Sequence, residues 1–381
     1  MTTATLLDTL HAALQIDVDS FSPAISTSIP FPPCDQTSNQ LWTLDEIQKP
    51  EVRELVEGAV KEYWHRGWEK TCDRIAALLC ARNIPNISGR VLLQVSCRYA
   101  YDMDEVVSHA WSYASELERV GIPRERICIK IPSTGPALNA AVPLRATGIE
   151  TLGTALFGLP QAIAAAQAGC LSISPYFNEI RAHFDKSLWP DVEDPAKEHP
   201  MSARVVHIVT TLHKLAQETG ERMPEVKLAS FLSAKEAMAA IELGCHSVTL
   251  PGPVLDSLKS TPSTSPPSSR PKDYKPYAQP PNLPPRLQML ENTDPLASAD
   301  WDGKLASTSL DYLAGNGELL DAAIQADPIT RERLGDALEA FVDAEMKMQA
   351  FLEEIARGLG LEKAKAEEGA AGEDGQPALE E

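Results

Sequence analysis

Eight short runs of apolar and β-branched residues recur along this chain, and stretches with helical spacing separate most of them. The predicted strands are Ala13 to Asp17, Cys34 to Ser38, Val91 to Val95, Ile127 to Ile131, Ile149 to Thr154, Cys170 to Ser174, Val226 to Ser230 and Ser247 to Leu250. The predicted helices between them include Val52 to Cys80, Met103 to Val120, Gly135 to Ala146, Pro160 to Ala168, Ala203 to Thr219 and Ala234 to Leu243. Strands that alternate with helices form parallel sheets, and eight of them favour a closed α/β barrel, the (β/α)8 TIM barrel, over an open sheet.

The composition changes after the eighth predicted strand and divides the 381 residues into four parts. Residues 1–260 form the predicted barrel core. Residues 261–285 hold nine prolines, which predicts an extended or disordered spacer and leaves a proline-rich partner site as the alternative. Residues 286–360 are expected to form a helical extension over one end of the barrel, because helical spacing returns there and predicts two helices. Residues 361–381, with seven acids and two lysines, predict a disordered acidic tail.

Charge and cysteine spacing limit the partners and the compartment. A net charge of −20 argues against nucleic acid or an anionic membrane as the main partner. The seven cysteines form no CxxC pair and no zinc spacing, which indicates buried free thiols in a reducing compartment and no metal site. The first residues lack the basic and apolar regions of a signal peptide, and no apolar run approaches about 18 residues. We therefore expect a cytoplasmic protein.

Lys130 stands between isoleucines in the fourth predicted strand. Alternation along a strand turns the three isoleucines of Ile127 to Ile131 to one face and Cys128 and Lys130 to the other. Burial lowers the pKa of a lysine from its reference of about 10.4, and the neutral amine can form a Schiff base with a carbonyl compound. The alternative is an edge-strand lysine whose stem reaches solvent.

Polar side chains recur with the same parity on other predicted strands. The positions of this parity are Leu92, Gln94 and Ser96; Glu150, Leu152 and Thr154; and Cys170, Ser172 and Ser174. In a parallel barrel such a face is the interior, and polar groups at the carboxyl ends of the strands build the active site. Lys130 joins this set, which favours an interior amine.

Several motifs, taken in their order and spacing, resemble the transaldolase family. They are Cys34 to Asn39, Gln94 to Arg98 with Asp102, Ile127 to Thr134, Gly148 with Ile149, Thr154 to Phe157, Gln161 to Gly169, Ile173 to Tyr176, Ala229 to Phe231 and the helix pair from Glu318. The resemblance covers most of residues 14–359. It implies a (β/α)8 barrel that needs no metal or cofactor, and a transaldolase-type transferase or related aldolase of pentose-phosphate-type sugar metabolism. Members transfer a dihydroxyacetone unit from a ketose to an aldose phosphate through a lysine Schiff base, and they are usually homodimers.

The resemblance also implies roles for individual residues. By position, Lys130 is the Schiff-base residue and Asp17 is the acid/base group for the C4 hydroxyl. Asn39 and Ser174 hold donor hydroxyls, and Thr154 orients the catalytic water. These roles suit the chemistry, because the iminium accepts electrons and carbon–carbon cleavage needs a carboxylate to take the hydroxyl proton.

Two alternatives remain open within these assignments. Asp19 lies two residues from Asp17 and competes with it for the acid/base role. Lys227 is a rival lysine on the seventh predicted strand. Its parity is opposite to that of Ser230, which predicts that Lys227 faces outward.

Two positions depart from the family pattern near the expected reaction centre. Gln94 stands where transaldolases carry a glutamate, and an amide can hold water but cannot ionise. Tyr176 stands where the family usually has phenylalanine, and its hydroxyl can donate or accept a proton. The related small fructose-6-phosphate aldolases also pair a glutamine with such a tyrosine, which favours simple aldol cleavage and addition.

Two further departures concern the substrate phosphate. The family holds it with two arginines, and the corresponding positions here are Glu179 and Leu232, with Arg181 two residues beyond the first. Ser230 remains as a substrate-binding hydroxyl, but it cannot replace two guanidinium groups. The substrate is therefore expected to be a sugar or hydroxyketone that can lack a phosphate. The alternative function is a catalytically impaired pseudoenzyme or scaffold that keeps the barrel.

Overall fold

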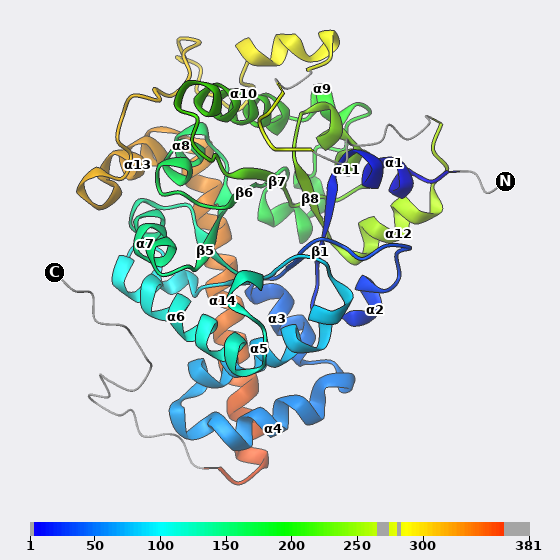
Figure 1. Ribbon diagram of the computed structural model, residues 1–381, viewed down its shortest axis with the longest axis vertical. Coiled ribbons are helices and arrows are strands. Elements are labelled where there is room, and N and C mark those ends of the chain that lie inside the picture. Colours follow the sequence, from blue (N-terminus) through cyan, green and yellow to red (C-terminus); the bar gives the residue numbers. More distant parts are fainter. Residues whose placement is uncertain (1–3, 265–273, 280–282, 362–381) are drawn as a thin grey trace.

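Eight parallel strands of the computed structural model close into a barrel in the order β1 to β8 (Figure 1). The strands are β1 (Gln15–Asp19), β2 (Gln36–Thr37), β3 (Val91–Gln94), β4 (Ile127–Pro132), β5 (Glu150–Leu156), β6 (Ser172–Pro175), β7 (Glu225–Leu228) and β8 (Ser247–Leu250). The predicted (β/α)8 fold is confirmed. The structure describes residues 4–264, 274–279 and 283–361.

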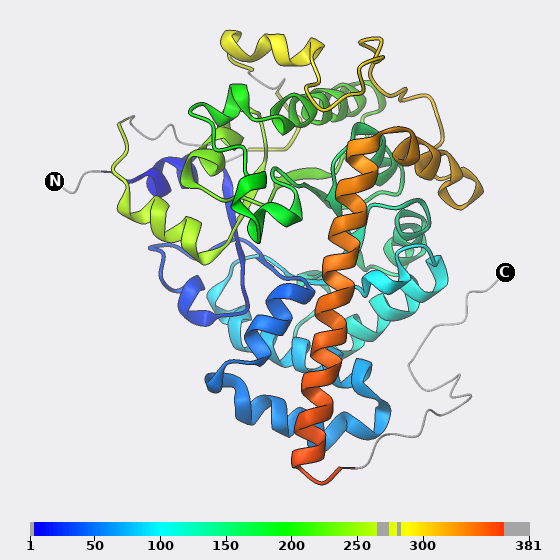
Figure 2. The same ribbon diagram turned by 180° about the vertical axis from the view of Figure 1, so that it is seen from behind.

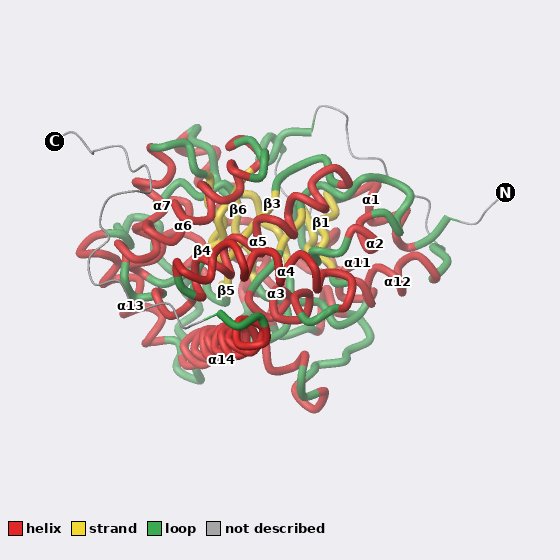
Figure 3. The backbone as a smooth tube through the Cα atoms, turned by 90° about the horizontal axis from the view of Figure 1, so that it is seen from below, coloured by secondary structure: helices red, strands yellow, loops and turns green. Residues whose placement is uncertain are grey.

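Helices surround the strands on the outside, and Figure 3 shows the strands grouped at the centre of this ring. The α-helices are α1 (Leu6–Ala13), α2 (Pro23–Ser26), α3 (Gln40–Ile47), α4 (Arg53–Tyr63), α5 (Trp68–Asn83), α6 (Met103–Arg119), α7 (Gly135–Ala146), α8 (Leu159–Gln167), α9 (Pro195–Glu198), α10 (Met201–Thr219), α11 (Ala234–Glu242), α12 (Gly252–Ser260), α13 (Ala314–Ala326) and α14 (Pro328–Gly358). No helix in the described part of the chain is both long enough and apolar enough to span a bilayer.

The first strand begins and ends two residues later than predicted. Helix α1 includes Ala13, because Thr5 and Asp8 form a reciprocal capping box that starts the helix upstream. Since the shift is two residues, the inward face keeps its parity, but the carboxyl end of the strand moves from Asp17 to Asp19. This displacement decides which carboxylate reaches the mouth of the barrel.

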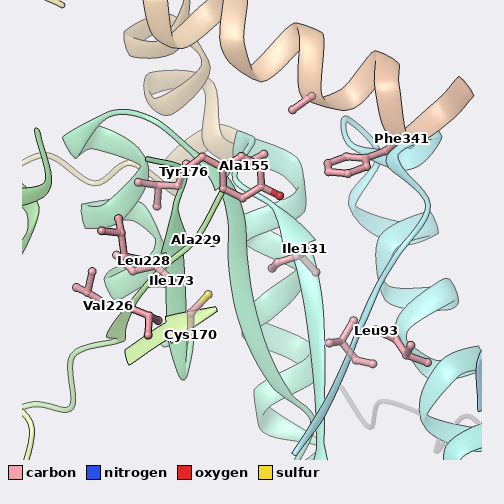
Figure 4. Packing of buried hydrophobic residues seen from close by; sticks show 14 of the residues in the cluster. Leu93, Ile131, Ala155, Cys170, Ile173, Tyr176, Val226, Leu228, Ala229 and Phe341 are labelled. Atoms are coloured by element: carbon pink, nitrogen blue, oxygen red, sulfur yellow. The ribbon is translucent and has the colours of Figure 1, made fainter. Parts of the chain in front are cut away.

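Two separate apolar clusters reflect the two faces of the strands. The large cluster lies between strands and helices, and Figure 4 shows Leu93, Ile131 and Ile173 within it. The small cluster, of Leu92, Cys128 and Leu152, lies apart from the large one. Leu92 is paired in register with Cys128, and Leu152 is paired with Lys130, two residues after Cys128. These residues therefore share the inward face, whereas Ile131 points outward. The predicted alternation of faces is therefore confirmed for these strands.

The carboxy-terminal extension lies across the barrel, as predicted. Helix α14 runs past the barrel from α13 toward α4, in orange in Figure 2, and contacts α3 and β5 on the way. Helix α13 approaches α7 closely, because Gly135 and Gly317 leave no room for side chains between them. A Cβ on Gly135 would lie 2.5 Å from the Gly317 oxygen, and Gly317 has a φ of 86°. The buried Arg204 of α10 ties the extension down through Asp327, at 2.7 Å.

The proline-rich segment is only partly within the described residues. Its residues 265–273 and 280–282, and residues 362–381 of the acidic tail, lie outside them. Tyr277 is buried, donates a hydrogen bond to the Pro224 carbonyl and lies 4.6 Å from the His246 ring. The described residues around Tyr277 are therefore docked beside the start of β7.

Candidate active site

A cavity of about 350 Å³ opens where the strands end. Its walls come from residues at or just beyond the carboxyl ends of β1, β4, β6, β7 and β8 and from the segments that follow them. The lining residues are Asp19, Asn39, Leu41, Trp42, Asp45, Lys130, Ser174, Tyr176, Ile180, His183, Phe184, Ala229, Ser230, Phe231, Thr249 and Pro251. The carboxyl end of the strands is where TIM barrels place their active sites.

Lys130 projects from β4 into this cavity with 5% of its surface exposed. Within the described residues, no side chain or carbonyl forms a hydrogen bond or ion pair with its Nζ. Desolvation lowers the pKa of the Lys130 amine below its ordinary value, while the Asp19 carboxylate acts in the opposite direction. The interior position predicted for Lys130 is correct, and its burial favours the neutral form of the amine.

Asp19 is the carboxylate that lines the same cavity. Its two oxygens accept hydrogen bonds from Thr37 Oγ1 and Trp42 Nε1, both at 2.6 Å. These donors come from β2 and α3, so three elements fix one carboxylate beside the amine. Asp17 is not among the residues that line the cavity.

Asp17 lies deeper in the barrel, in a buried cluster with Asp35 and Lys227. Lys227 Nζ contacts Asp17 Oδ2 at 2.9 Å and Asp35 Oδ2 at 2.8 Å. Burial alone would lower the pKa of Lys227, but the two carboxylates raise it well above its ordinary value. Burial raises the pKa of Asp17 to about 6. The predicted outward position of Lys227 is therefore wrong.

The reason for this error is the backbone at Ser230. Ser230 follows β7 and has a φ of 67°, so the regular alternation of side chains between the two faces ends before this residue. The direction of the Ser230 side chain therefore cannot be used to assign a face to Lys227. Asp17, Cys34 and Asp35 place ligand-type atoms within 4.8 Å of one another. The Lys227 ammonium lies between the two carboxylates and offsets part of their negative charge.

Tyr176 and Thr154 meet at the mouth of the barrel. Thr154 Oγ1 donates to the Tyr176 hydroxyl at 3.2 Å, and Tyr176 itself lines the cavity. Burial raises the pKa of Tyr176 above its ordinary value, so the phenol keeps its proton. Because the phenol oxygen accepts from Thr154, its own proton remains for a group in the cavity. Ala155, with a φ of 52°, lies where the β5–β6 register shifts between Gly153 and Leu156.

Asn39 and Ser174 both line the cavity, from the start of α3 and from β6. Asn39 caps α3, because its Oδ1 accepts a hydrogen bond from the Trp42 backbone at 3.1 Å. This bond fixes the amide plane. It leaves Nδ2 as the group that Asn39 can offer to a ligand.

Gln94 lies beside Lys130 in the β3–β4 register but lines a different space. A chamber of about 30 Å³ behind it is walled by Gln94 and Glu345 of α14, among others. Gln94 Nε2 donates to Gln40 at 2.6 Å, and no described residue bonds its buried Oε1. The chamber has room for about two waters. Gln94 is not among the described residues that line the Lys130 cavity.

The arginines with which the family holds a substrate phosphate have no counterpart in this cavity. None of the described residues that line it is an arginine. Arg181 is half exposed and pairs with Asp336 of α14 at 3.4 Å. Glu179 and Leu232 are absent from the lining residues as well. Ser230 is present, and its partner is His183, which sequence reasoning missed because no motif or periodicity marks the segment that carries it.

Comparison with known proteins identifies the family. A family model described as Transaldolase/Fructose-6-phosphate aldolase matches residues 24–352. The chain belongs to this family. Two curated relatives are both named Transaldolase: that of Synechocystis sp. is 31% identical over 262 residues, covering 64% of each chain, and that of Gloeobacter violaceus is 30% identical over 269 residues, covering 68% of this chain and 66% of the relative. This chain therefore spans slightly less than two thirds of the length of either relative.

The resemblance drawn from the motifs is confirmed at the level of the Transaldolase/Fructose-6-phosphate aldolase family. The match begins at residue 24, after β1, so the choice between Asp17 and Asp19 depends on geometry. A solved structure of an IMP dehydrogenase/GMP reductase-like protein from Corynebacterium glutamicum is 12% identical, with a TM-score of 0.38 and coverage of 66% of this chain and 69% of that chain. A likeness this weak carries no argument about fold or function.

Proposed function

We propose that this protein is a transaldolase-type class I aldolase in which Lys130 forms a Schiff base with a ketose of the dihydroxyacetone type. The observation that carries the proposal is the Lys130 amine, which faces a cavity of about 350 Å³ with a lowered pKa and no ion pair to a described residue. A buried amine without a partner costs stability, so its retention favours a chemical role. Family membership supports the same reaction class.

The reaction begins at the Lys130 amine. The neutral amine attacks the ketose carbonyl, and the carbinolamine takes a proton from solvent and loses its hydroxyl as water, which gives a protonated imine. A carboxylate then takes the proton of the hydroxyl two carbons away, the carbon–carbon bond breaks, and its electrons enter the iminium to give an enamine and an aldehyde. The enamine either attacks a second aldehyde or takes a proton and is hydrolysed.

We assign the carboxylate step to Asp19 in place of Asp17. Asp19 lines the cavity that holds the amine, whereas Asp17 is fully buried and bound to Lys227 at 2.9 Å. A general base must reach the proton that it takes. The two hydrogen bonds from Thr37 and Trp42 stabilise the ionised form of Asp19 and hold it in one orientation.

Tyr176 is proposed to give its phenolic proton to the enamine and to take one back from solvent, while Asp19 releases the proton that it took; Thr154 positions the Tyr176 hydroxyl. The Thr154 hydrogen bond leaves the phenolic proton for the cavity. Asn39 and Ser174 are proposed to hold donor hydroxyls, because both line the cavity with Lys130. Gln94 cannot ionise and lines the neighbouring chamber, which favours aldol cleavage and addition over efficient transfer. An inactive scaffold has no support in the comparisons.

Borohydride trapping tests the proposal. The protein is mixed with dihydroxyacetone or fructose, reduced with borohydride, and measured by intact mass and peptide mapping. We expect one reduced adduct on the peptide with Lys130, and none on the peptide with Lys227, whose ammonium is held by two carboxylates. No adduct on the wild type, or an adduct that persists in Lys130→Ala, would overturn the Schiff-base assignment.

A further inference from the structure

His183 and Ser230 form a hydrogen-bonded pair in the wall of the cavity that holds the Lys130 amine. Ser230 follows β7, which lies three strands from β4 around the barrel, and His183 ends the short 3-10 helix Ile180–His183. Both line the cavity together with Phe184 and Phe231. A substrate bound to Lys130 would extend toward this wall once it is longer than the atoms that react.

The partners of Ser230 determine which nitrogen of His183 carries a proton. Ser230 Oγ donates to the Asn178 carbonyl at 2.8 Å, and His183 Nε2 lies 2.8 Å from the same Oγ. A carbonyl oxygen only accepts, so the single hydroxyl proton goes to Asn178 and His183 Nε2 must donate to Ser230. Nδ1 is then an acceptor, and no described residue bonds it. Burial lowers the pKa of His183, so the neutral ring is the form at neutral pH.

The backbone of Ser230 is strained for a residue with a side chain. Its φ of 67° is a conformation that glycine adopts freely and serine adopts at a cost of about 1–3 kcal/mol. Two hydrogen bonds from Asn178 to the Ser230 carbonyl, at 2.9 Å from Nδ2 and 3.2 Å from the backbone, keep it there. A strained residue whose hydroxyl fixes a cavity-lining histidine is better explained by ligand recognition than by packing.

The charges of the cavity exclude a good phosphate site at this wall. Lys130 is the sole lysine or arginine among the described lining residues, while Asp19 and Asp45 contribute acids. Arg181 points to α14, where it pairs with Asp336 at 3.4 Å and with Glu332 at 3.9 Å. A phosphate dianion here would lose solvation, and none of the described residues that line this wall is a lysine or arginine that could pair with it, since Lys186 acts on His183 from outside the lining.

We infer that His183 and Ser230 are a specificity element that accepts a hydroxyl of an uncharged polyol chain, so that the substrates are unphosphorylated hydroxyaldehydes and ketoses. In this arrangement a substrate hydroxyl donates to His183 Nδ1, and the apolar faces of Phe184 and Phe231 contact the carbon chain. This inference rests on the proposed function, because it describes the far end of the same substrate.

The test compares the kcat/KM for glyceraldehyde with that for glyceraldehyde 3-phosphate as acceptors of the dihydroxyacetone unit. We expect the wild type to prefer glyceraldehyde. His183→Phe should raise the KM for glyceraldehyde about tenfold with little change in kcat, and His183→Arg should shift the preference toward the phosphate by about 10- to 100-fold, the range of one charged hydrogen bond. Ser230→Gly, which suits the positive φ, should fold normally and raise the same KM by freeing the ring.

Three results separate the possible failures. A wild type that prefers the phosphate, or a preference that neither His183 variant changes, would overturn the inference. Arg181→Ala is the matched control and should leave the preference unchanged; loss of phosphate use in this variant would assign phosphate binding to Arg181 and would also overturn it. Dihydroxyacetone has three carbons and does not need the far wall, so its trapping on Lys130 tests the proposed function separately.

Discussion

Two lysines lie inside the same barrel, Lys130 near the mouth and Lys227 deeper, and they behave in opposite ways. Lys130 faces a cavity without an ion pair to a described residue, and its pKa is lowered. Lys227 contacts two carboxylates within 3 Å, and its pKa is raised. Both are almost fully buried, at 5% and 3% exposure. Burial therefore does not by itself make an amine reactive, because the neighbouring charges decide which form is favoured.

The largest expected effect is a difference in kcat between variants of Asp19, which lies near Lys130, and of Asp17, which is paired with Lys227. Asp19→Asn should lower kcat by about 10²–10⁴-fold, because the cavity would lose its base, while the protein stays folded. Asp17→Asn should change kcat by less than about tenfold, because Asp17 does not line the cavity. Steady-state cleavage of fructose, with thermal midpoints of both variants, measures this. The reverse ranking would return the base to Asp17.

The deeper lysine should matter for stability. Lys227→Met should lower the free energy of unfolding by about 3–5 kcal/mol, because Asp17 and Asp35 would remain buried without their cation. Urea denaturation measures the loss. Adding Asp35→Asn should restore part of it, since one buried charge is removed. A loss below about 1 kcal/mol would mean that the cluster is solvated or neutral.

Tyr277 tests whether the segment after the barrel supports this deeper end. Tyr277→Ala should lower the free energy of unfolding by about 3 kcal/mol, because a buried ring and its hydrogen bond to Pro224 are lost. Trapping of dihydroxyacetone on Lys130 should remain at the wild-type rate. An unchanged denaturation midpoint would show that the docked residues act only as a spacer.

Tyr176 tests the proton path near the mouth. Tyr176→Phe should slow aldol cleavage by about 10²-fold, because the phenolic proton is removed, whereas Phe keeps the ring against Phe157, 5.6 Å away. Borohydride trapping should proceed at the wild-type rate. Equal losses in trapping and cleavage would assign Tyr176 to shaping the cavity.

The smallest expected effect is a difference in the pH dependence of stability. The folded-state pKa of Lys130 is below that of the unfolded chain, so the unfolded state binds more protons and stability rises as the pH rises toward 10.5. Lys130→Met should therefore be stabilised relative to the wild type near pH 7, by an amount that decreases toward pH 10. Lys227 has a raised pKa, so its contribution is constant below 10.5 and is lost only above. Urea titrations at several pH values test both signs, and a constant difference would contradict the lowered pKa of Lys130.

The fold was largely predictable, because eight β-runs and the periodic helices between them are local patterns. Boundaries were less so. The segment Val52 to Cys80 looked like one helix, but Gly67, with a φ of 94°, separates α4 from α5. In the site, Lys130, Thr154 and Tyr176 were found from parity and motif, and the structure brings them to one end of the barrel.

Local patterns did not predict how deep a side chain lies in the barrel, or which residues far apart in the sequence contact one another. The end of β1 depends on its pairing with β2 and β8, which sets Asp19 level with Thr37. Parity cannot separate Asp17 from Asp19, because the two residues share a face. His183 acquires its position through Ser230 and Asn178, which lie on other segments.

The sequence by itself determined the barrel, its inward polar face and the presence of a lysine with isoleucine neighbours, because alternation along a strand needs only local residues. The tertiary structure alone decided which lysine is paired and which has no ion pair to a described residue. Asp17 lies in β1, Asp35 just before β2 and Lys227 in β7, and their charges interact only when the barrel closes. The pKa of a buried amine is set by such neighbours, and a sequence does not contain their distances.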